Sequence, residues 1–347
     1  MKQLSSLSLR GSIAAILLVS AAAADAESFH VSTFATGAAV HATAPDSIAL
    51  TKNSVWVSFT NGADSTGLGG NSTVVRYSLT GHVRKQYSFA GSVDGLRVDP
   101  STGLVWVLQN QDGNSTLTLI DTEENAVSQP IPYAVTSTTR GIDDVAFKAG
   151  KAYLSYTNPT GPADATIELV QPDSNPLVVT PILLEGATGT NLATGQSNQP
   201  TTQTDPDSIK VTPDGDLMLT SGSDGQLVFV ERPGTAKQSV SFLQLLDSSL
   251  TPVSGLDDAV FATSRKGTFF LSDTANNRIL KIVADDLQVG ALFASVGSLN
   301  AFTSVNQMTG VVTPITAITG LHGPHGIGFM AHQEDDEDAG SHEDAGK

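Results

Sequence analysis

Five aspartates and one histidine are the residues of this sequence best placed to do chemistry, because all six stand in the same short phrase. In each phrase the key residue precedes a small residue or a second aspartate and then an apolar residue, as in Pro206-Asp207-Ser208-Ile209. The six key residues are Asp46, Asp94, Asp143, Asp207, Asp257 and His325. Carboxylates bind hard divalent cations, and carboxylates and histidine both act as general acids and bases. The phrase is therefore the place to look for a metal site or an acid–base site.

The spacing of the phrase indicates which elements must position these residues. Successive key residues are 48, 49, 64, 50 and 68 positions apart, so one repeat of 48 to 50 residues recurs with two insertions. A repeat of this length indicates a propeller or a solenoid, and units that read as strands favour the propeller. Each phrase opens a strand, and turn residues such as Pro213-Asp214-Gly215 separate it from the strands that follow. We predict an all-β, six-bladed β-propeller with four-stranded blades.

The later strands and the insertions complete this plan. Second strands are expected at 54–60, 103–108, 152–156, 216–220 and 268–271, and third strands at 72–79, 115–120, 226–231 and 278–283. The pair at 268–271 and 278–283 follows the Asp257 phrase and is assigned to the same blade as Asp257. The insertions fall at 185–204 and at about 285–308, and the first is either a functional loop such as a lid or a mobile surface loop. The sixth blade is either partial or closed by an outer strand from Phe29 to Phe34.

The first strand of every blade lines the central channel, so the six key residues should meet around one axis; we call them the ring. Loops between second and third strands should overhang the ring with Asn61, Asn110, Asp112, Asn158, Asp224 and Asn276. Five converging carboxylates stay together if some are protonated, if backbone amides donate to them, or if a cation lies among them. The cation would be calcium first, then magnesium or manganese. The alternative is that each aspartate accepts hydrogen bonds from amides of its own turn or of a neighbouring blade.

The first residues carry an export signal. Lys2 and Arg10 precede an apolar run at 13–24, and Ala24-Asp25-Ala26 is a small-x-small cleavage pattern. This predicts a signal peptide over residues 1–26, cleaved before Glu27, with an apolar run too short to span a membrane. We expect a secreted or periplasmic protein with its propeller at 27–331 and a disordered acidic tail at 332–347. The chain has no cysteine, which excludes disulfides and anchoring through a lipid-modified cysteine.

The charge of the chain restricts its partners. It has 18 basic and 35 acidic residues, a formal net charge of −17. Such a surface repels nucleic acid and anionic lipid and favours cations or neutral ligands. We therefore expect no nucleic-acid or membrane partner, but a small neutral or cationic ligand, or a protein, on the ring face of a monomer.

Three stretches resemble a known group of propellers: PDSIKVTPDGDLMLT, GLDDAVFATSRKGTFFLSDTANNRILKI and HGPHGIGF. They are similar to blade repeats of the six-bladed NHL and senescence-marker-protein/gluconolactonase group, and the similarity extends over about residues 40 to 330. In the metal-dependent lactonases of that group, residues of this phrase bind the divalent ion. By position the resemblance implies Asp207 and Asp94 most directly as ligands, then Asp46, Asp143, Asp257 and His325. Those lactonases have Glu in the first phrase and Asn in some later ones, whereas this chain has Asp46 first and Asp nearly throughout.

Two functions follow from these observations. The first is a metal-dependent hydrolase of a lactone or small ester, in which the ion polarises the carbonyl and Asp207 or His325 acts as the base. The second is a non-catalytic exported propeller that binds a small ligand or a protein on the ring face.

Overall fold

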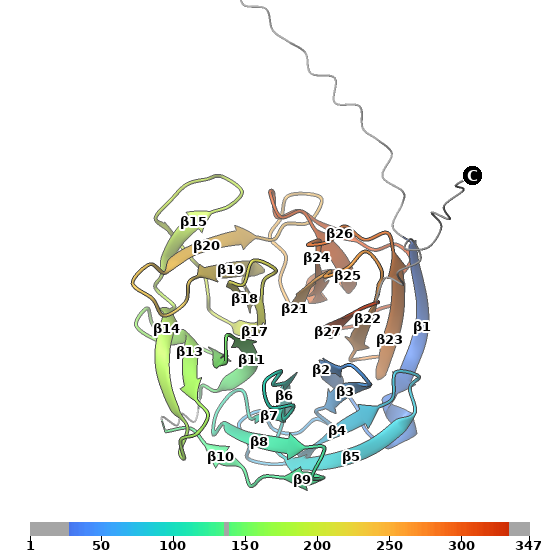
Figure 1. Ribbon diagram of the computed structural model, residues 1–347. Coiled ribbons are helices and arrows are strands. Elements are labelled where there is room, and N and C mark those ends of the chain that lie inside the picture. Colours follow the sequence, from blue (N-terminus) through green and yellow to red (C-terminus); the bar gives the residue numbers. More distant parts are fainter. Residues whose placement is uncertain (1–27, 135–138, 333–347) are drawn as a thin grey trace, which may run out of the picture.

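Six β-sheets surround a central axis in the computed structural model of the chain (Figure 1). The structure describes residues 28–134 and 139–332, so the expected signal peptide and all but the first residue of the expected tail lie outside the described ranges. Within those ranges, helical structure is limited to two short 3-10 segments, η1 (Gly37–Val40) and η2 (Gly297–Leu299). None of the described helices has the length and apolar character needed to cross a bilayer. The chain is thus the all-β, six-bladed propeller that the repeat predicts.

Each blade is one sheet whose strands follow one another outward from the axis. Blade 1 is β2 (Pro45–Thr51), β3 (Ser54–Phe59), β4 (Asn71–Tyr77) and β5 (Val83–Ala90). Blade 2 is β6 (Val93–Val98), β7 (Val105–Gln109) and β8 (Thr116–Asp121), with β9 (Ala126–Val127) and β10 (Ile131–Pro132) paired to β8. Blade 3 is β11 (Ile142–Lys148), β12 (Lys151–Tyr156), β13 (Ala165–Gln171) and β14 (Val178–Leu184). Blade 4 is β17 (Pro206–Val211), β18 (Leu217–Ser221), β19 (Gln226–Glu231), β20 (Ser239–Gln244), β15 (Thr188–Asn191) and β16 (Gln199–Pro200). Blade 5 is β21 (Leu256–Phe261), β24 (Leu292–Val296), β25 (Ala301–Val305) and β26 (Val312–Pro314), and blade 6 is β27 (Pro324–Ala331), β22 (Gly267–Asp273), β23 (Arg278–Asp285) and β1 (Ser28–Thr36).

Blades 5 and 6 exchange strands, which corrects the assignment made from the sequence. After β21 the chain leaves blade 5, forms β22 and β23 of blade 6, and returns to blade 5 as β24. The segment at about 285–308 is therefore not an insertion, because it contains β24 and β25, the second and third strands of blade 5. The strands at 268–271 and 278–283 were correctly identified as strands but were placed in the wrong blade.

The other insertion, at 185–204, also forms strands. β15 pairs in parallel with β20, the outer strand of blade 4, and β16 pairs with β15. The hairpin thus extends the sheet away from the axis (Figure 1). Its place at the outer edge does not support a lid over the ring.

The N-terminal and C-terminal strands close the propeller. β1 pairs with β23 from Ser28 opposite Asp285 to Thr36 opposite Arg278, and β27 pairs with β22 at the axis. Blade 6 therefore takes its innermost strand from the end of the chain and its outermost strand from the beginning. This confirms that an N-terminal strand around Phe29 to Phe34 completes the sixth blade.

The hydrophobic core lies between the blades. Six clusters of buried side chains occupy the six interfaces between neighbouring blades. The second strands contribute to both of their interfaces, and every residue of β3, β7, β18 and β22 is buried. Because these strands are covered on both faces, they are rich in apolar residues without strict alternation. The packed blades leave the channel at the axis as the place for polar groups.

Candidate functional site

All six ring residues occupy the second position of an innermost strand. They are Asp46 of β2, Asp94 of β6, Asp143 of β11, Asp207 of β17, Asp257 of β21 and His325 of β27. The structure brings them together as two groups, Asp94 with Asp143 and Asp207, and Asp46 with Asp257 and His325. In each group one ligand atom of every member lies within 4.8 Å of the others. Each group comes from three consecutive blades, so the ring has two halves.

A β-bulge aims these residues at the axis. In β2 the regular pairing with β3 breaks between Pro45 and Ile48, and β6, β11, β17 and β21 break at the same place relative to their ring residue. A bulge disturbs the alternation of side chains and re-aims the residues within it. It therefore lets two consecutive residues, such as Asp143 and Asp144, both contribute to the centre of the propeller.

Hydroxyl groups of the neighbouring strands accept hydrogen bonds from the amides that follow the ring residues. The amides of Ser47 and Asp144 donate to Ser58 Oγ and Ser155 Oγ at 2.9 and 2.8 Å. Those of Ser208 and Asp258 donate to Thr220 Oγ1 and Ser295 Oγ at 2.9 and 3.1 Å. Among the described residues, no backbone amide donates to a ring carboxylate. The alternative in which each aspartate is satisfied by the amides of its own turn therefore has no support in the geometry.

His325 is the cationic partner of one half of the ring. Its Nδ1 lies 2.9 Å from Asp257 Oδ1 and 3.2 Å from Asp46 Oδ1. The negative charge of Asp257, together with hydrogen bonds to both carboxylates, raises the pKa of His325 to about 12 against the effect of burial. His325 is thus held as an imidazolium, and within the described ranges it is the one cationic side chain in contact with ring carboxylates.

The other half of the ring has no such partner. Burial raises the pKa of Asp94, Asp143 and Asp207 well above the usual range, and the negative charges of neighbouring ring carboxylates raise it further. Asp143 is only 8% exposed. These three carboxylates therefore remain together either by holding protons or by sharing a cation.

The loop residues expected to overhang the ring form hydrogen bonds within and between the loops instead. Asn61 accepts from the amide of Thr43, Asn158 donates to Asp112 Oδ1, and Asn276 donates to Asp273. Likewise, Asn110 donates to the carbonyl of Asn114, and Asp224 accepts from Thr204 and Ser221. These contacts account for polar side chains at the blade ends without a ligand.

Sequence reasoning missed four charged residues next to the ring: Arg97, Asp144, Lys210 and Asp258. Arg97 Nη2 lies 2.6 Å from Asp144 Oδ2, and Lys210 Nζ lies 2.6 Å from Asp258 Oδ1, with all four side chains at most 16% exposed. The doubled aspartates of Ile142-Asp143-Asp144-Val145 and Leu256-Asp257-Asp258-Ala259 were the available signal for two of them.

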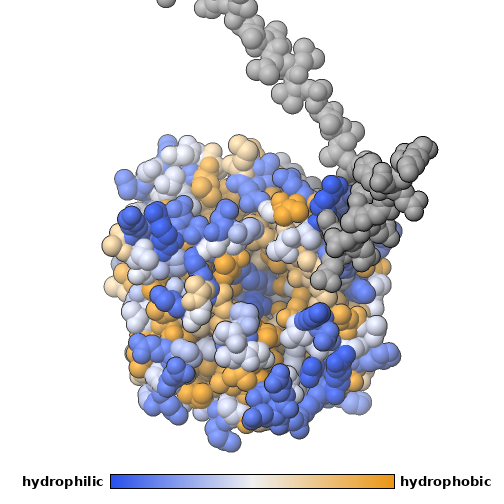
Figure 2. All heavy atoms as spheres, in the orientation of Figure 1, coloured by the Kyte–Doolittle hydropathy of each residue, from blue (hydrophilic) through white to orange (hydrophobic). Residues whose placement is uncertain are grey.

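The surface of the molecule is hollowed at its centre. Figure 2 shows this hollow with a hydrophilic floor.

Solved propellers share this fold at low sequence identity. A streptogramin B lyase matches with a TM-score of 0.50 and 13% identity, over 86% of this chain and 90% of that chain. The resemblance predicted from the repeats is thus confirmed for the fold. A protein described as a putative gluconolactonase matches with a TM-score of 0.48 and 11% identity, over 82% of this chain and 80% of that chain. The periplasmic gluconolactonase PpgL of Pseudomonas aeruginosa matches with a TM-score of 0.48 and 10% identity, over 83% of this chain and 88% of that chain.

No protein-family model matches the chain, and no curated protein does either. Propellers of one fold carry many unrelated functions, so identities this low show the fold alone. Function has to be argued from the ring itself.

Proposed function

We propose that this protein is a divalent-cation-dependent hydrolase of a lactone or similar small ester, with the ring as its reaction centre. One observation carries the proposal: the ring gathers five carboxylates with a single imidazolium in contact and, in the described part of the chain, no amide donors. Crowded carboxylates of this kind are stable at neutral pH when a cation offsets their repulsion. Calcium is the first choice, and magnesium or manganese the next.

The half formed by Asp94, Asp143 and Asp207 fits the cation best. It offers three carboxylates with one oxygen of each within 4.8 Å of the others, and hard oxygen donors suit these divalent ions. Asp46 and Asp257 already share the imidazolium of His325. The six ligands predicted from the sequence therefore narrow to three in this proposal.

The ring residues have distinct tasks in ester hydrolysis. A bound divalent cation supplies Lewis-acid polarisation of a carbonyl. Asp207 accepts a proton from the water whose oxygen forms the new bond to the carbonyl carbon, while the ester C–O bond breaks. Asp207 then passes this proton to the departing oxygen, to which His325 donates a hydrogen bond, so that Asp207 is a carboxylate again and water has been added across the C–O bond. We assign the base to a carboxylate because His325 Nδ1 is engaged by two carboxylates and carries a proton.

The charge of the ring favours a neutral or cationic substrate. A lactone is neutral and opens to a hydroxy acid, which is an anion at neutral pH. The acidic face repels that anion and so promotes its release. A substrate that is already anionic should be a poor one.

The test begins with the cation. Wild type and Asp207→Asn, each freed of metal with a chelator, are titrated with calcium, magnesium and manganese by calorimetry and then assayed on neutral γ- and δ-lactones and small esters. Glu168→Gln is the control, since Glu168 is a buried carboxylate of β13 with no place in the ring. We expect cation-dependent turnover in wild type and the control and its loss in Asp207→Asn. A wild type that binds none of the three ions at millimolar concentration contradicts the proposal.

Cation binding without turnover on the full panel would instead support the non-catalytic reading, a propeller that binds a small neutral or cationic ligand or a protein on the ring face. Export belongs to the same proposal, because the N-terminal segment reads as a signal peptide. The mature protein should begin at Glu27, and N-terminal sequencing of the protein from its native host checks this.

A further inference from the structure

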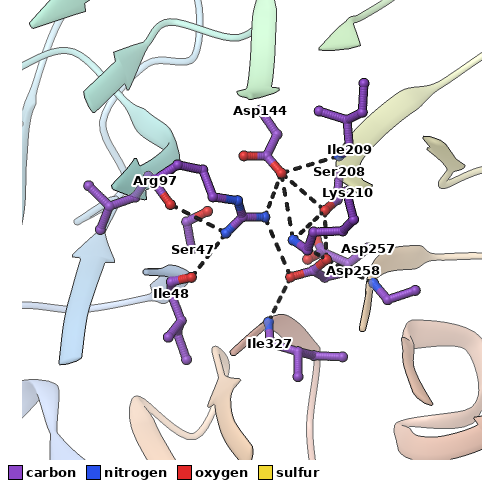
Figure 3. Close-up of polar contacts among 12 residues, drawn as sticks. Ser47, Ile48, Arg97, Asp144, Ser208, Ile209, Lys210, Asp257, Asp258 and Ile327 are labelled. Carbon is purple, nitrogen blue, oxygen red and sulfur yellow. Dashed lines mark hydrogen bonds and ion pairs between the residues drawn. The ribbon is translucent and has the colours of Figure 1, made fainter. Parts of the chain in front are cut away.

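Five polar side chains fill the channel one layer beyond the ring, and we call them the hub (Figure 3). The hub consists of Arg97, Asp144, Ser208, Lys210 and Asp258. Each stands one to three positions after the ring residue of its strand, so a few ångströms separate the two layers. With two cations and two carboxylates, the hub is formally neutral and does not offset the charge of the ring.

The hub is one connected network. Arg97 Nη2 lies 2.6 Å from Asp144 Oδ2 and 4.0 Å from Asp258 Oδ2. Lys210 Nζ lies 2.6 Å from Asp258 Oδ1 and 3.7 Å from Asp144 Oδ2. The hydroxyl of Ser208 lies 2.6 Å from Asp258 Oδ1 and 3.1 Å from Asp144 Oδ2. Every hub residue thus contacts hub residues of two other blades.

This network reaches the innermost strands of all six blades. Arg97 of β6 donates to the carbonyl of Ile48 in β2 at 3.0 Å and binds Asp144 of β11. Ser208 and Lys210 belong to β17, and Asp258 belongs to β21. Asp258 Oδ2 accepts from the amide of Ile327 in β27 at 2.9 Å. The hub therefore connects the six innermost strands directly beside their ring residues.

Two glycines make the ring sensitive to the spacing between these strands. A Cβ on Gly95 would lie 2.0 Å from the carbonyl oxygen of Asp143, and a Cβ on Gly326 would lie 2.5 Å from that of Asp46. At these points neighbouring innermost strands approach so closely that backbone contacts the backbone of a ring residue. A change in the spacing of the strands therefore moves the carboxylates themselves.

Stability alone does not account for four buried charges at this position. Well-packed apolar residues commonly replace buried ion pairs without loss of stability, because desolvation opposes the attraction between the charges. Such pairs specify geometry when their partners are directional, and a guanidinium holds a carboxylate and a carbonyl at fixed angles as an ammonium cannot. Arg97 has this arrangement between Asp144 and Ile48.

We propose that the hub positions the ring, so that Arg97, Asp144, Lys210 and Asp258 are positioning residues that hold Asp94, Asp143 and Asp207 at the separation a divalent cation requires. This inference rests on the proposed function for the cation and on the geometry of the network for the rest. Residues that orient ligands without touching the ion commonly change metal affinity by about 10- to 100-fold.

The test replaces Arg97 by lysine, which keeps the charge of the hub but loses the guanidinium that spans two blades. The matched control is Arg278→Lys, because Arg278 also binds a carboxylate and a carbonyl, those of Asp273 and Gly320, on the third strand of blade 6. Calcium affinity is measured by calorimetry, together with the melting temperature. We expect Arg97→Lys to weaken calcium binding about 10-fold or more, with Arg278→Lys unchanged. Unchanged affinity in Arg97→Lys overturns the proposal.

A second readout keeps the hub testable if the wild type binds no cation. The Nδ1 proton of His325 lies between Asp257 and Asp46, so its NMR resonance in the metal-free protein reports the geometry of the ring. We expect the resonance to shift or broaden in Arg97→Lys and to stay in place in Arg278→Lys. Absence of cation binding then contradicts the proposed function, and an unmoved resonance contradicts the hub proposal. If Arg97→Lys does not fold, Ser208→Ala, which removes a hydroxyl shared by Asp144 and Asp258, is measured in the same way.

Discussion

The ring and the hub occupy neighbouring layers of one channel, yet their carboxylates are neutralised in different ways. In the hub, Asp144 and Asp258 contact Arg97, Lys210 and the hydroxyl of Ser208. In the ring, the imidazolium of His325 contacts Asp46 and Asp257. Asp94, Asp143 and Asp207 contact no cation of the described chain. The hub carboxylates therefore have cationic partners within the protein, whereas the proposed function assigns a bound cation to the three ring carboxylates that have none.

The largest expected effect comes from breaking the hub. Lys210→Met removes the ammonium that lies 2.6 Å from Asp258 and leaves Arg97 as the one cationic side chain in contact with Asp144 and Asp258 among the described residues. An uncompensated buried charge costs about 3–5 kcal/mol of unfolding free energy, which guanidinium denaturation measures. The double variant Lys210→Met/Asp258→Asn should recover part of that loss. A cost below about 1 kcal/mol for the single variant would mean that hub carboxylates are no better paired than those of the ring.

A buried carboxylate outside both layers provides the reference. Burial raises the pKa of Glu168 in β13 to about 7, although the charge of Arg140 opposes the rise. The folded protein then retains a proton that the unfolded chain loses near pH 4.5, so stability is higher at low pH and falls as the pH rises to about 7. In wild type this loss of unfolding free energy is about 3 kcal/mol, and Glu168→Gln should remove it. Denaturation curves from pH 4.5 to 8 check this, and added calcium should leave the difference between the two proteins unchanged.

Substitutions in the ring should change the unfolding free energy with the opposite sign to substitutions in the hub. Asp207→Asn and Asp94→Asn each remove one of the crowded charges, so the metal-free protein should gain about 1–2 kcal/mol at pH 8. Because the pKa values of Asp94 and Asp207 are raised, the cation-free wild type should lose stability as the pH rises, and calcium should reduce that loss. Thermal melts with chelator and with excess calcium measure both effects. Destabilised variants together with a calcium-insensitive wild type would place these aspartates with the hub.

The same contrast shows how far the sequence could be interpreted. A six-fold phrase of the right period predicted the six innermost strands and the ring residues that open them, while the closing strand β1 was one of two alternatives for the sixth blade. Aromatic and branched residues identified β22 and β23 as strands but not the blade to which they belong, because a strand buried on both faces packs equally well in either blade. Arg97 and Lys210 escaped notice because single charged residues in strands are usually exposed. Arg97 and Lys210 point into the channel because each lies beyond the bulge of its strand. The residue types of the phrase do not predict that bulge.

The smallest expected effect concerns Asp207 itself. Gly222 follows β18, and its backbone lies outside the left-handed region, so alanine is allowed there. A Cβ on Gly222 would lie 3.0 Å from Asp205 Oδ2 and 3.2 Å from Asp207 Oδ2. Asp205 cannot easily move, because its Oδ2 accepts from both the amide and the hydroxyl of Ser223 at 3.1 and 2.7 Å. We therefore expect the added methyl group to be accommodated in part by a shift of the Asp207 carboxylate of a few tenths of an ångström.

Stability should change by less than about 1 kcal/mol in Gly222→Ala, because only the end of a side chain is displaced. Calcium affinity should nevertheless fall a few-fold, since Asp207 contributes to the half of the ring that fits a cation. A comparable methyl group beside a hub carboxylate would disturb stability and affinity together, because that carboxylate is held by protein partners. Calorimetric titration and melts of Gly222→Ala measure the two quantities separately. If affinity stays the same while the fold is intact, Asp207 is not a ligand of the cation, and the assignment of the cation to Asp94, Asp143 and Asp207 is wrong.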